Sequence, residues 1–369
     1  MVKLKMSMLP LKKTFSAVKI SNQLLLKMNI NPLKAPENEA SIMEYWKYTD
    51  KVYISCVCIT FNQEDYIKDA INGMLAQITD YRFEIVIHDD KSTDSTREIL
   101  LGFKQRYPNL IKLVLQDENQ YQKGKKITPL AVAEAIGEYI ALCEGDDYWV
   151  DINKIQKQVK CLEENKDINI CFTSAKSIYR NKINLFSYHS SSKRIYTTEQ
   201  VIEGGGGFMP TMSIMLRSKM MANLPEWYYT APVGDYFLQI YLSIPYGAIY
   251  LPDHTSVYRI NSIGSWSNQR KHLCIKKIKA EGELYISTLQ QLKDMGVSNS
   301  LINKEISKQY MYFTILAIKN NFSKDAKDLI DISWLYSKSI SKKQIFLYYA
   351  KTLYPMINIV MKLRNYYTQ

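Results

Sequence analysis

Three carboxylates crowd the end of one short apolar segment of this chain. The run YIALC at residues 139–143 carries no charge and predicts a buried strand. Glu144, Gly145, Asp146 and Asp147 follow it directly. Like charges raise each other's energy, and a divalent cation with oxygen ligands, its open positions taken by phosphate, would relieve the repulsion. The alternative is a solvated acidic turn between a strand and a helix.

A second polar cluster, DDKSTDST, begins at Asp89 directly after another apolar run. Carboxylates at the end of a buried strand can accept hydrogen bonds from a nucleoside base and its ribose, so Asp89 and Asp90 are candidates for nucleotide binding. A side chain at Asp94 or Ser95 is equally suited to cap the helix that follows. The cluster therefore predicts a nucleotide contact, a helix cap, or both.

These clusters need a scaffold that brings them together, and alternating patterns in the first half of the chain predict one. Strands are expected at residues 52–60, 83–88, 111–115 and 138–143, and helices at 66–77, 95–106 and 129–136. Such alternation is typical of a parallel sheet covered by helices, in which right-handed crossovers place the strand-to-helix loops at one edge. Ligands bind at this edge, where residues 60–64, 89–94 and 144–147 would meet.

The remainder of the chain divides into a less regular part and a helical part. Further strands are expected at 168–175, 212–217 and 250–257, further helices at 151–165 and 234–244, and a polar surface segment at 176–200. Helical spacing then covers about 273–292, 301–320, 323–338 and 343–364. We therefore predict a basic N-terminal extension at residues 1–50, an α/β domain at 51–269 and a helical basic region at 270–369.

The net charge of +12 belongs to the two ends of the chain. Residues 1–36 contain seven Lys and no acid, and residues 332–369 contain five Lys, one Arg and no acid. Apolar side chains among these cations suit an anionic membrane surface better than a nucleic acid, so no nucleic-acid partner is expected. The alternative is that the basic ends only keep the protein soluble.

The cysteine pattern and the lengths of the apolar runs indicate where in the cell the protein is expected. The six cysteines form no CxxC pair, so we expect small buried side chains in a reducing compartment. No apolar run reaches the roughly 18 residues needed to span a bilayer, and the N-terminus lacks a secretory signal pattern. These features predict a cytoplasmic protein, with a peripheral position on the inner face of the cytoplasmic membrane if the basic ends bind lipid.

Three blocks carry a resemblance to a known family. TFNQEDYI at residues 60–67, HDDKSTDST at 88–96 and EGDDYW at 144–149 resemble, in order and spacing, those of a family 2 glycosyltransferase of the bacterial surface-polysaccharide type. The resemblance covers roughly residues 52–267. It implies the GT-A nucleotide-diphospho-sugar transferase fold, a Rossmann-like mixed sheet flanked by helices. It also implies inverting transfer of a sugar from a nucleotide sugar, often a UDP-sugar, to an acceptor hydroxyl on a saccharide or lipid-linked partner, with Mn²⁺ or Mg²⁺ as cofactor.

The resemblance assigns roles to individual residues in the donor-side blocks. Asp146 would bind the metal ion and Glu144 would lie toward the ribose, while Asp147 would support the turn. Glu144 stands where relatives have Asp, which keeps the carboxylate and adds one methylene of reach. Asp89 or Asp90 would meet the base. The other donor-binding candidates in these loops are Thr60, Asn62, Glu64 and Ser92.

The resemblance also points to the acceptor side. GDY at residues 234–236 resembles a later acidic motif at the start of a helix, which makes Asp235 the candidate general base for the acceptor hydroxyl. An N-cap aspartate is the alternative for the same position. The acceptor-side or site-closing candidates are Thr211, Arg259, Asn261 and Trp266.

Asn261 motivates one of two alternative functions. Relatives often have His where Asn261 stands, and Asn is a poor ligand for transition metals. A catalytically impaired partner that binds a nucleotide sugar is therefore one alternative to the transferase. The other is a sugar nucleotidyltransferase, which would need a phosphate loop rich in Gly and Lys or Arg where residues 60–64 read TFNQE.

Overall fold

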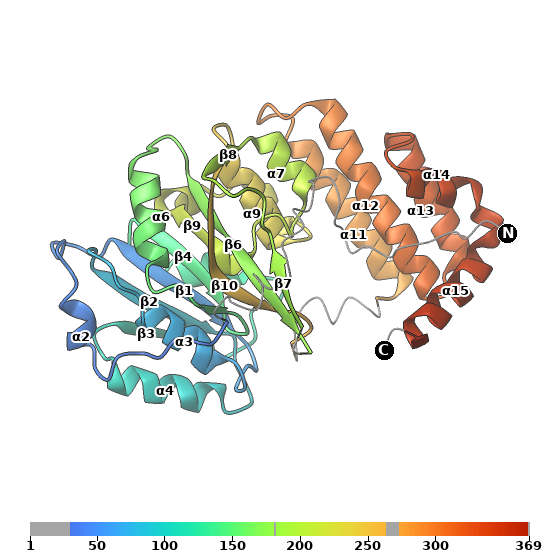
Figure 1. The fold of residues 1–369 in the computed structure, drawn as a ribbon. Coiled ribbons are helices and arrows are strands. Elements are labelled where there is room, and N and C mark those ends of the chain that lie inside the picture. The colour runs from blue at the N-terminus through green and yellow to red at the C-terminus, as the bar shows by residue number, and fades with distance from the viewer. Residues whose placement is uncertain (1–29, 181, 263–272, 368–369) are drawn as a thin grey trace.

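The computed structural model describes residues 30–180, 182–262 and 273–367, in which one mixed sheet of ten strands is flanked by helices (Figure 1). The strands are β1 (Ile54–Thr60), β2 (Phe83–Asp89), β3 (Ile111–Leu115), β4 (Tyr139–Glu144), β5 (Tyr148–Trp149), β6 (Ile170–Tyr179), β7 (Lys182–Phe186), β8 (Arg194–Tyr196), β9 (Ile214–Arg217) and β10 (Ala248–Arg259). The central order is β3-β2-β1-β4-β9-β6-β10-β5, with β7 beside β6 and β8 beside β10.

Strand register places the predicted clusters at one edge of this sheet. β1 pairs in parallel with β2 and with β4, so that Thr60 lies beside Asp89 and Ile59 lies beside Glu144. The polar loops that follow these three strands therefore start from neighbouring positions, as the alternating pattern predicted. β9 runs antiparallel to both β4 and β6, which makes the sheet mixed.

Helices cover both faces of the sheet and continue beyond it. They are α2 (Ala40–Met43), α3 (Ile67–Leu75), α4 (Thr96–Arg106), α5 (Ile127–Val132), α6 (Lys154–Glu163), α7 (Thr198–Gly204), α8 (Glu226–Thr230), α9 (Gly234–Ser243), α11 (Ile275–Gln291), α12 (Asn299–Lys319), α13 (Ser323–Tyr336), α14 (Lys342–Tyr349) and α15 (Tyr354–Tyr367). Short 3₁₀ turns precede β9 at Thr211–Ser213 and α15 at Lys351–Leu353.

Side-chain alternation along the strands produces two apolar cores. In β1, Cys56 and Cys58 face the core shared with α3, α4 and α6, whereas Val57 faces the opposite core with α5, α7 and α9. The second core is continuous with the C-terminal helices, because the Phe237 ring in α9 lies 5.7 Å from the Tyr285 ring in α11. The predicted α/β class with a mixed sheet and a helical C-terminal region is confirmed. The domain boundaries remain predictions.

The structure corrects three sequence-based expectations. Residues 176–200 are not simply a polar surface segment, because β6 extends to Tyr179 and is followed by β7 and β8. β7 pairs with β6 and does alternate, with partly buried Ile183 and Leu185 between exposed Lys182 and Asn184, but the pattern covers only five residues. The helix expected at 343–364 is broken into α14 and α15, since Pro355 lacks an N–H and would clash with the Lys351 carbonyl in a continuous helix. Cys274 is exposed, whereas the other five cysteines are buried.

None of the helices in the described ranges is long and apolar enough to cross a membrane. The longest, α12, has 21 residues but contains charged positions along its length. Bilayer-spanning helices need about 20 predominantly apolar residues.

α6 carries a lysine that is fully buried beneath the sheet. Lys154 Nζ donates to Gln158 Oε1 at 2.7 Å and lies 4.2 Å from the centre of the Trp149 ring. Burial removes the water that stabilises an ammonium group, and it lowers the pKa of Lys154 to about 8. The folded chain therefore holds this proton less tightly than the unfolded chain does.

We expect Lys154 to make folding stability depend on pH in the alkaline range. Between about pH 8 and pH 10.5 the unfolded lysine keeps its proton and the folded one loses it, so stability rises with pH. Relative to the Lys154→Met variant, the free energy of unfolding of the wild type should gain about 3 kcal/mol across this interval. Denaturant titrations of both proteins at several pH values measure the gain. Parallel pH profiles would contradict the assignment.

Candidate functional site

The acidic turn between β4 and β5 is held tightly against the end of β1. The Gly145 N–H donates to the Ile59 carbonyl at 3.0 Å. A Cβ at Gly145 would lie 2.2 Å from Gln63 Oε1 and 2.8 Å from Thr60 Oγ1, and these two side chains are themselves hydrogen-bonded at 2.8 Å. Glycine is thus favoured for steric reasons, because a larger residue would force the turn or the Thr60 and Gln63 side chains to shift.

Carboxylates from two distant parts of the sequence converge at this turn. Glu144 is largely desolvated, and Asp146 and Asp235 lie close enough for their negative charges to act on it. Burial first, and then these two charges, raise the pKa of Glu144 to about 8, while a hydrogen bond with Thr211 opposes the shift. The structure therefore brings together four of the predicted site residues.

Asp235 lies in the first turn of α9, which begins at Gly234 after the N-cap residue Val233. The predicted alternative of an N-cap aspartate is therefore wrong. The Asp235 carboxylate accepts the Tyr236 N–H at 2.8 Å. Water can reach it, yet protein atoms surround it closely enough for desolvation to raise its pKa.

Lys126 is the cation whose charge acts on the Asp235 carboxylate. Its ammonium donates to the Ala231 carbonyl, and its aliphatic stem packs over Gly234, where a Cβ would lie 3.6 Å from Lys126 Cδ. The positive charge of Lys126 lowers the pKa of Asp235 and so opposes the effect of burial. Burial in turn lowers the pKa of Lys126. Lys126 thus favours the ionised form of Asp235.

Asp146 and Asp147 have different surroundings although they are adjacent. The Asp146 carboxylate accepts a hydrogen bond from Ser262 Oγ. Asp147 is fully buried, and its Oδ1 accepts the Arg259 N–H at 2.9 Å. Burial and the charges of Asp146 and Glu144 raise the pKa of Asp147 well above its usual range. Asp147 therefore faces the end of β10, in agreement with the supporting role predicted for it.

Arg259 ties the acidic turn to α3. Its Nη1 donates to the Asp146 carbonyl at 2.9 Å, its Nη2 forms an ion pair with Asp69, and its guanidinium lies 4.3 Å from the centre of the Tyr148 ring. The sequence marked Arg259 as an acceptor-side candidate but gave no signal for Asp69 or Ser262. Both lie far along the chain from the turn, although Ser262 directly follows the candidate Asn261.

The loops after β1 and β2 are locked together by side-chain hydrogen bonds. Asn62, at a left-handed φ of 52°, donates its N–H to Ser92 Oγ at 2.9 Å and accepts the Thr93 N–H at 2.7 Å. The Glu64 carboxylate accepts the Ser95 N–H at 2.8 Å. The predicted donor-binding residues Asn62, Glu64 and Ser92 therefore join the two loops, Asn62 by bonding to Ser92 and Glu64 by bonding to Ser95.

Asp89 and Asp90 are both engaged within the chain. Asp89 is fully buried, pairs with Arg97 Nε at 2.5 Å and accepts the Ser92 N–H at 3.1 Å. Asp90 accepts the N–H groups of Gln120 and Tyr121 at 2.7 and 3.0 Å, and so fixes the loop that follows β3. Of the two, Asp90 lies one residue beyond the strand, so it is the better placed to meet a ligand at the sheet edge.

The last two predicted residues are less informative. Asn261 has a left-handed φ of 60° and lies next to Ser262, which contacts Asp146. Trp266 lies outside the described residues.

The acidic turn fits a divalent cation by its chemistry. Within residues 30–180, 182–262 and 273–367, no three His, Cys, Asp or Glu side chains form a ligand set that could hold a metal ion by themselves. Glu144 and Asp146 nevertheless supply hard oxygen ligands, and their mutual repulsion is the kind that a cation removes. A site with one or two carboxylates suits an ion whose other ligands are phosphate oxygens and water.

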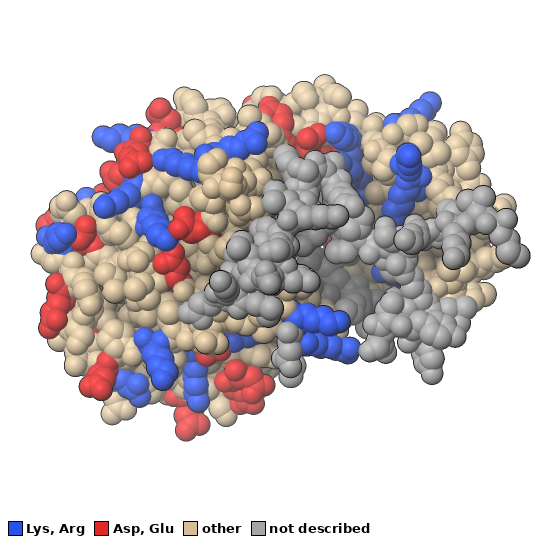
Figure 2. All heavy atoms as spheres, in the orientation of Figure 1, with Lys and Arg blue, Asp and Glu red and all other residues tan. Residues whose placement is uncertain are grey.

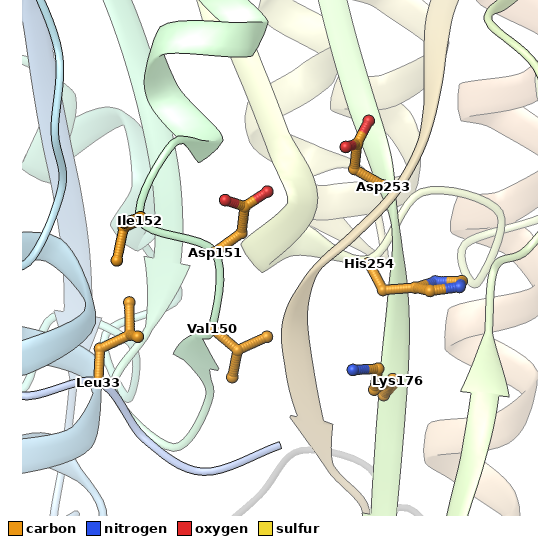
Figure 3. A pocket seen from close by; sticks show the side chains of 7 residues that line it. All are labelled: Leu33, Val150, Asp151, Ile152, Lys176, Asp253 and His254. Carbon is orange, nitrogen blue, oxygen red and sulfur yellow. The ribbon is translucent and has the colours of Figure 1, made fainter. Parts of the chain in front are cut away.

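A separate pocket of about 500 Å³ lies behind β5 (Figure 3). It is lined by Leu33, Val150, Asp151, Ile152, Lys176, Asp253 and His254. Both of its carboxylates are paired with Lys157 at 2.7 Å, and the His254 ring, which contacts Ser174 Oγ at 2.8 Å, points away from the opening. None of the predicted donor-side residues lines this pocket, so we place the candidate site at the acidic turn instead.

Comparisons with known proteins find similarity to glycosyltransferases. The model of the glycosyl transferase family 2 matches residues 55–223, which include the acidic turn. An uncharacterized protein of Mycobacterium tuberculosis is 33% identical over 215 residues, or 58% of this chain and 60% of that protein. A UDP-Glc:α-D-GlcNAc-diphosphoundecaprenol β-1,3-glucosyltransferase of Escherichia coli, WfaP, is 35% identical over 114 residues, or 31% of this chain and 42% of that protein.

Solved structures share the fold at low sequence identity. The crystal structure of S. aureus TarS 1–349 in complex with UDP-GlcNAc superposes with a TM-score of 0.58 at 14% identity, covering 84% of this chain and 88% of that one. The predicted GT-A fold is thereby confirmed. The matched region spans only about three fifths of the mycobacterial relative's length.

We expect Gly145→Ala to destabilise the protein through the contacts with Gln63 and Thr60. Overpacking of this kind costs about 1–3 kcal/mol, so the midpoint of thermal unfolding should fall. Gly102→Ala is the matched control, because a Cβ at Gly102 in α4 meets nothing within 4 Å and alanine favours the helix. Equal midpoints for the two variants would show that the turn is not packed as described.

Proposed function

We propose that this chain, which matches the model of glycosyl transferase family 2 over residues 55–223, transfers a sugar from a UDP-sugar to an acceptor hydroxyl in the synthesis of a polysaccharide or related glycan. Transfer proceeds with inversion at the anomeric carbon. The observation that carries the proposal is the convergence of Glu144 and Asp146 from the β4–β5 turn with Asp235 from the start of α9.

On the donor side, the carboxylates of the turn act on the nucleoside diphosphate. Asp146 would hold Mn²⁺ or Mg²⁺, which supplies positive charge to stabilise the departing diphosphate. Glu144 lies toward the ribose and Asp90 toward the base. Thr60, Asn62, Glu64 and Ser92 hold the surrounding loops in place and present their remaining polar atoms to the donor.

On the acceptor side, Asp235 removes the proton from the attacking hydroxyl. A general base works best when its pKa approaches the working pH, and the raised pKa of Asp235 moves it in this direction. Water access to Asp235 leaves room for an acceptor, while the positive charge of Lys126 favours the ionised carboxylate. Thr211, Arg259, Asn261 and Trp266 remain proposals for the acceptor-side wall of the site.

The relatives support the choice of substrates. WfaP, by its name, uses UDP-Glc and an acceptor linked to diphosphoundecaprenol. A UDP-sugar donor and a saccharide or lipid-linked acceptor are accordingly the substrates that we propose. Such an acceptor fits a peripheral position on the inner face of the cytoplasmic membrane.

A panel of nucleotide sugars tests the function directly. Purified full-length protein is incubated with each donor and Mn²⁺, and release of the nucleoside diphosphate is followed with and without acceptor. Turnover of one or more UDP-sugars supports the proposal. Binding without turnover would favour a catalytically impaired partner, and chemistry that depends on pyrophosphate would favour a nucleotidyltransferase.

Two substitutions should separate donor binding from transfer. Asp146→Ala should abolish the dependence of UDP binding on Mn²⁺, because it removes the carboxylate assigned to the ion. Asp235→Asn should leave UDP affinity within about twofold and lower the transfer rate by at least about a hundredfold, as expected for loss of a general base. Isothermal titration and initial rates measure the two effects.

The opposite pattern would reject the assignments. Unchanged metal-dependent binding in Asp146→Ala would remove Asp146 from the metal site. Full transfer activity in Asp235→Asn would leave Asp235 as a residue of the α9 start with no part in proton transfer.

Lys126 should set the acidic limb of the pH–rate profile. Since its positive charge lowers the pKa of Asp235, Lys126→Met should raise that pKa and move the acidic limb of kcat/KM to higher pH by about half a unit. Lys125→Met is the matched control, because Lys125 is its exposed neighbour. An unshifted limb in Lys126→Met, or an equal shift in both variants, would contradict the coupling of Lys126 to Asp235.

A further inference from the structure

The C-terminal helix α15 exposes a row of large apolar side chains. Met356 is 64% exposed, Ile359 59% and Val360 58%, and Leu353 in the preceding turn is 46% exposed. Leu353, Met356, Ile359 and Val360 stand at positions i, i+3, i+6 and i+7, so they lie on one side of the helix. We call this set the outer side of α15.

The opposite side of α15 is already packed against the protein. Tyr354 is fully buried and donates to the Leu347 carbonyl at 2.9 Å, and Asn358 donates to Asn321 Oδ1 at 2.6 Å. Folding of the chain therefore explains only one side of the helix. A surface helix usually carries polar residues on its second side, and an apolar second side indicates that something else covers it.

The two helices that precede α15 expose further large apolar side chains. Tyr349 is 74% exposed and Phe346 41% exposed in α14, and Leu335 at the end of α13 is 80% exposed. The Tyr349 ring lies 5.9 Å from the Trp334 ring, so α13 and α14 are in contact beside these side chains. Exposed apolar groups of this size are concentrated in the last three helices.

The same region of the chain is rich in positive charge. Residues 332–369 contain five Lys, one Arg and no Asp or Glu, and Lys338 and Lys342, before and at the start of α14, are exposed. In Figure 2, the coloured part of the C-terminal end that faces the viewer shows blue side chains and no red ones, whereas Asp331 in α13 is exposed and pairs with Lys351. The region thus combines apolar side chains with cations, as do helices that lie in the interface of anionic membranes.

Charge distinguishes between the partners that could cover the outer side of α15. A second copy of the chain would bring the same basic residues and be repelled, and so would the N-terminal segment, since residues 1–29 contain six Lys and no acid. An anionic lipid surface is complementary in both charge and polarity. We propose that the outer side of α15, with Tyr349 and its neighbouring lysines, docks the protein on an anionic membrane.

The docking surface is separate from the acidic turn. α14 and α15 lie at the end of the molecule opposite α4 and β3, while the turn lies at the edge of the central sheet (Figure 1). Docking through α15 therefore leaves the β4–β5 turn uncovered. The proposal holds independently of the reaction catalysed there.

Vesicle sedimentation with the full-length protein tests the proposal. Binding is measured to vesicles of phosphatidylglycerol mixed with phosphatidylcholine and to vesicles of phosphatidylcholine alone. The wild type should bind only the first. Met356→Ser with Ile359→Ser should weaken this binding at least about tenfold, because it removes the apolar anchor, and Lys338→Gln with Lys342→Gln should weaken it several-fold.

Ile136→Ser is the matched control, because Ile136 is an apolar side chain that is 70% exposed in the α/β domain. It should bind vesicles as the wild type does, and all variants should bind UDP equally. Vesicle binding that survives Met356→Ser with Ile359→Ser would overturn the proposal. A wild type that is oligomeric by light scattering and becomes monomeric with these two substitutions would show that a second copy covers α15.

Discussion

The burial of several carboxylates at the end of β4 is the constraint on which the site depends. Glu144, Asp146 and Asp147 lie within four residues, and Asp235 approaches them from α9. Desolvation and mutual repulsion raise the pKa values of Glu144 and Asp147, so the cluster stores unfavourable electrostatic energy when it is fully ionised. Under the proposed function, a divalent cation held at Asp146 would relieve this energy and supply positive charge for the diphosphate of the donor. Metal binding and donor binding should therefore strengthen each other.

The rest of the fold keeps these carboxylates from moving apart. Gly145 lets the turn rest on β1, and Arg259 connects it to α3 through Asp69. The loops after β1 and β2 are joined by Asn62 and its partners, which gives the site a rigid rim. Preorganisation of this kind reduces the reorganisation needed during the reaction, which is the usual source of electrostatic catalysis. The C-terminal helices contribute through α9, since their core is continuous with the one that supports Asp235.

Local patterns in the sequence predicted most of the α/β core and the acidic turn. Buried parallel strands are continuous apolar runs, and their carboxyl ends must meet at one edge, so Glu144 and Asp89 could be placed before the structure was known. Contacts that depend on tertiary packing could not be. Arg259 reaches Asp69 across 190 positions of sequence, and nothing in either segment signals this pair. The strand β7 alternates polar and apolar residues over only five positions within an otherwise polar segment, and the helix break before Pro355 was obscured by an otherwise helical pattern.

A crystal structure with UDP-sugar and Mn²⁺ bound would test the central claim most directly. The account predicts an anomalous manganese peak at the Asp146 carboxylate, with the diphosphate at the β4–β5 turn. It also predicts that Asp235 faces the anomeric carbon from the side opposite the diphosphate. Nucleotide bound elsewhere, for example in the pocket beside Lys176, with Asp146 still hydrogen-bonded to Ser262 and free of metal, would contradict it.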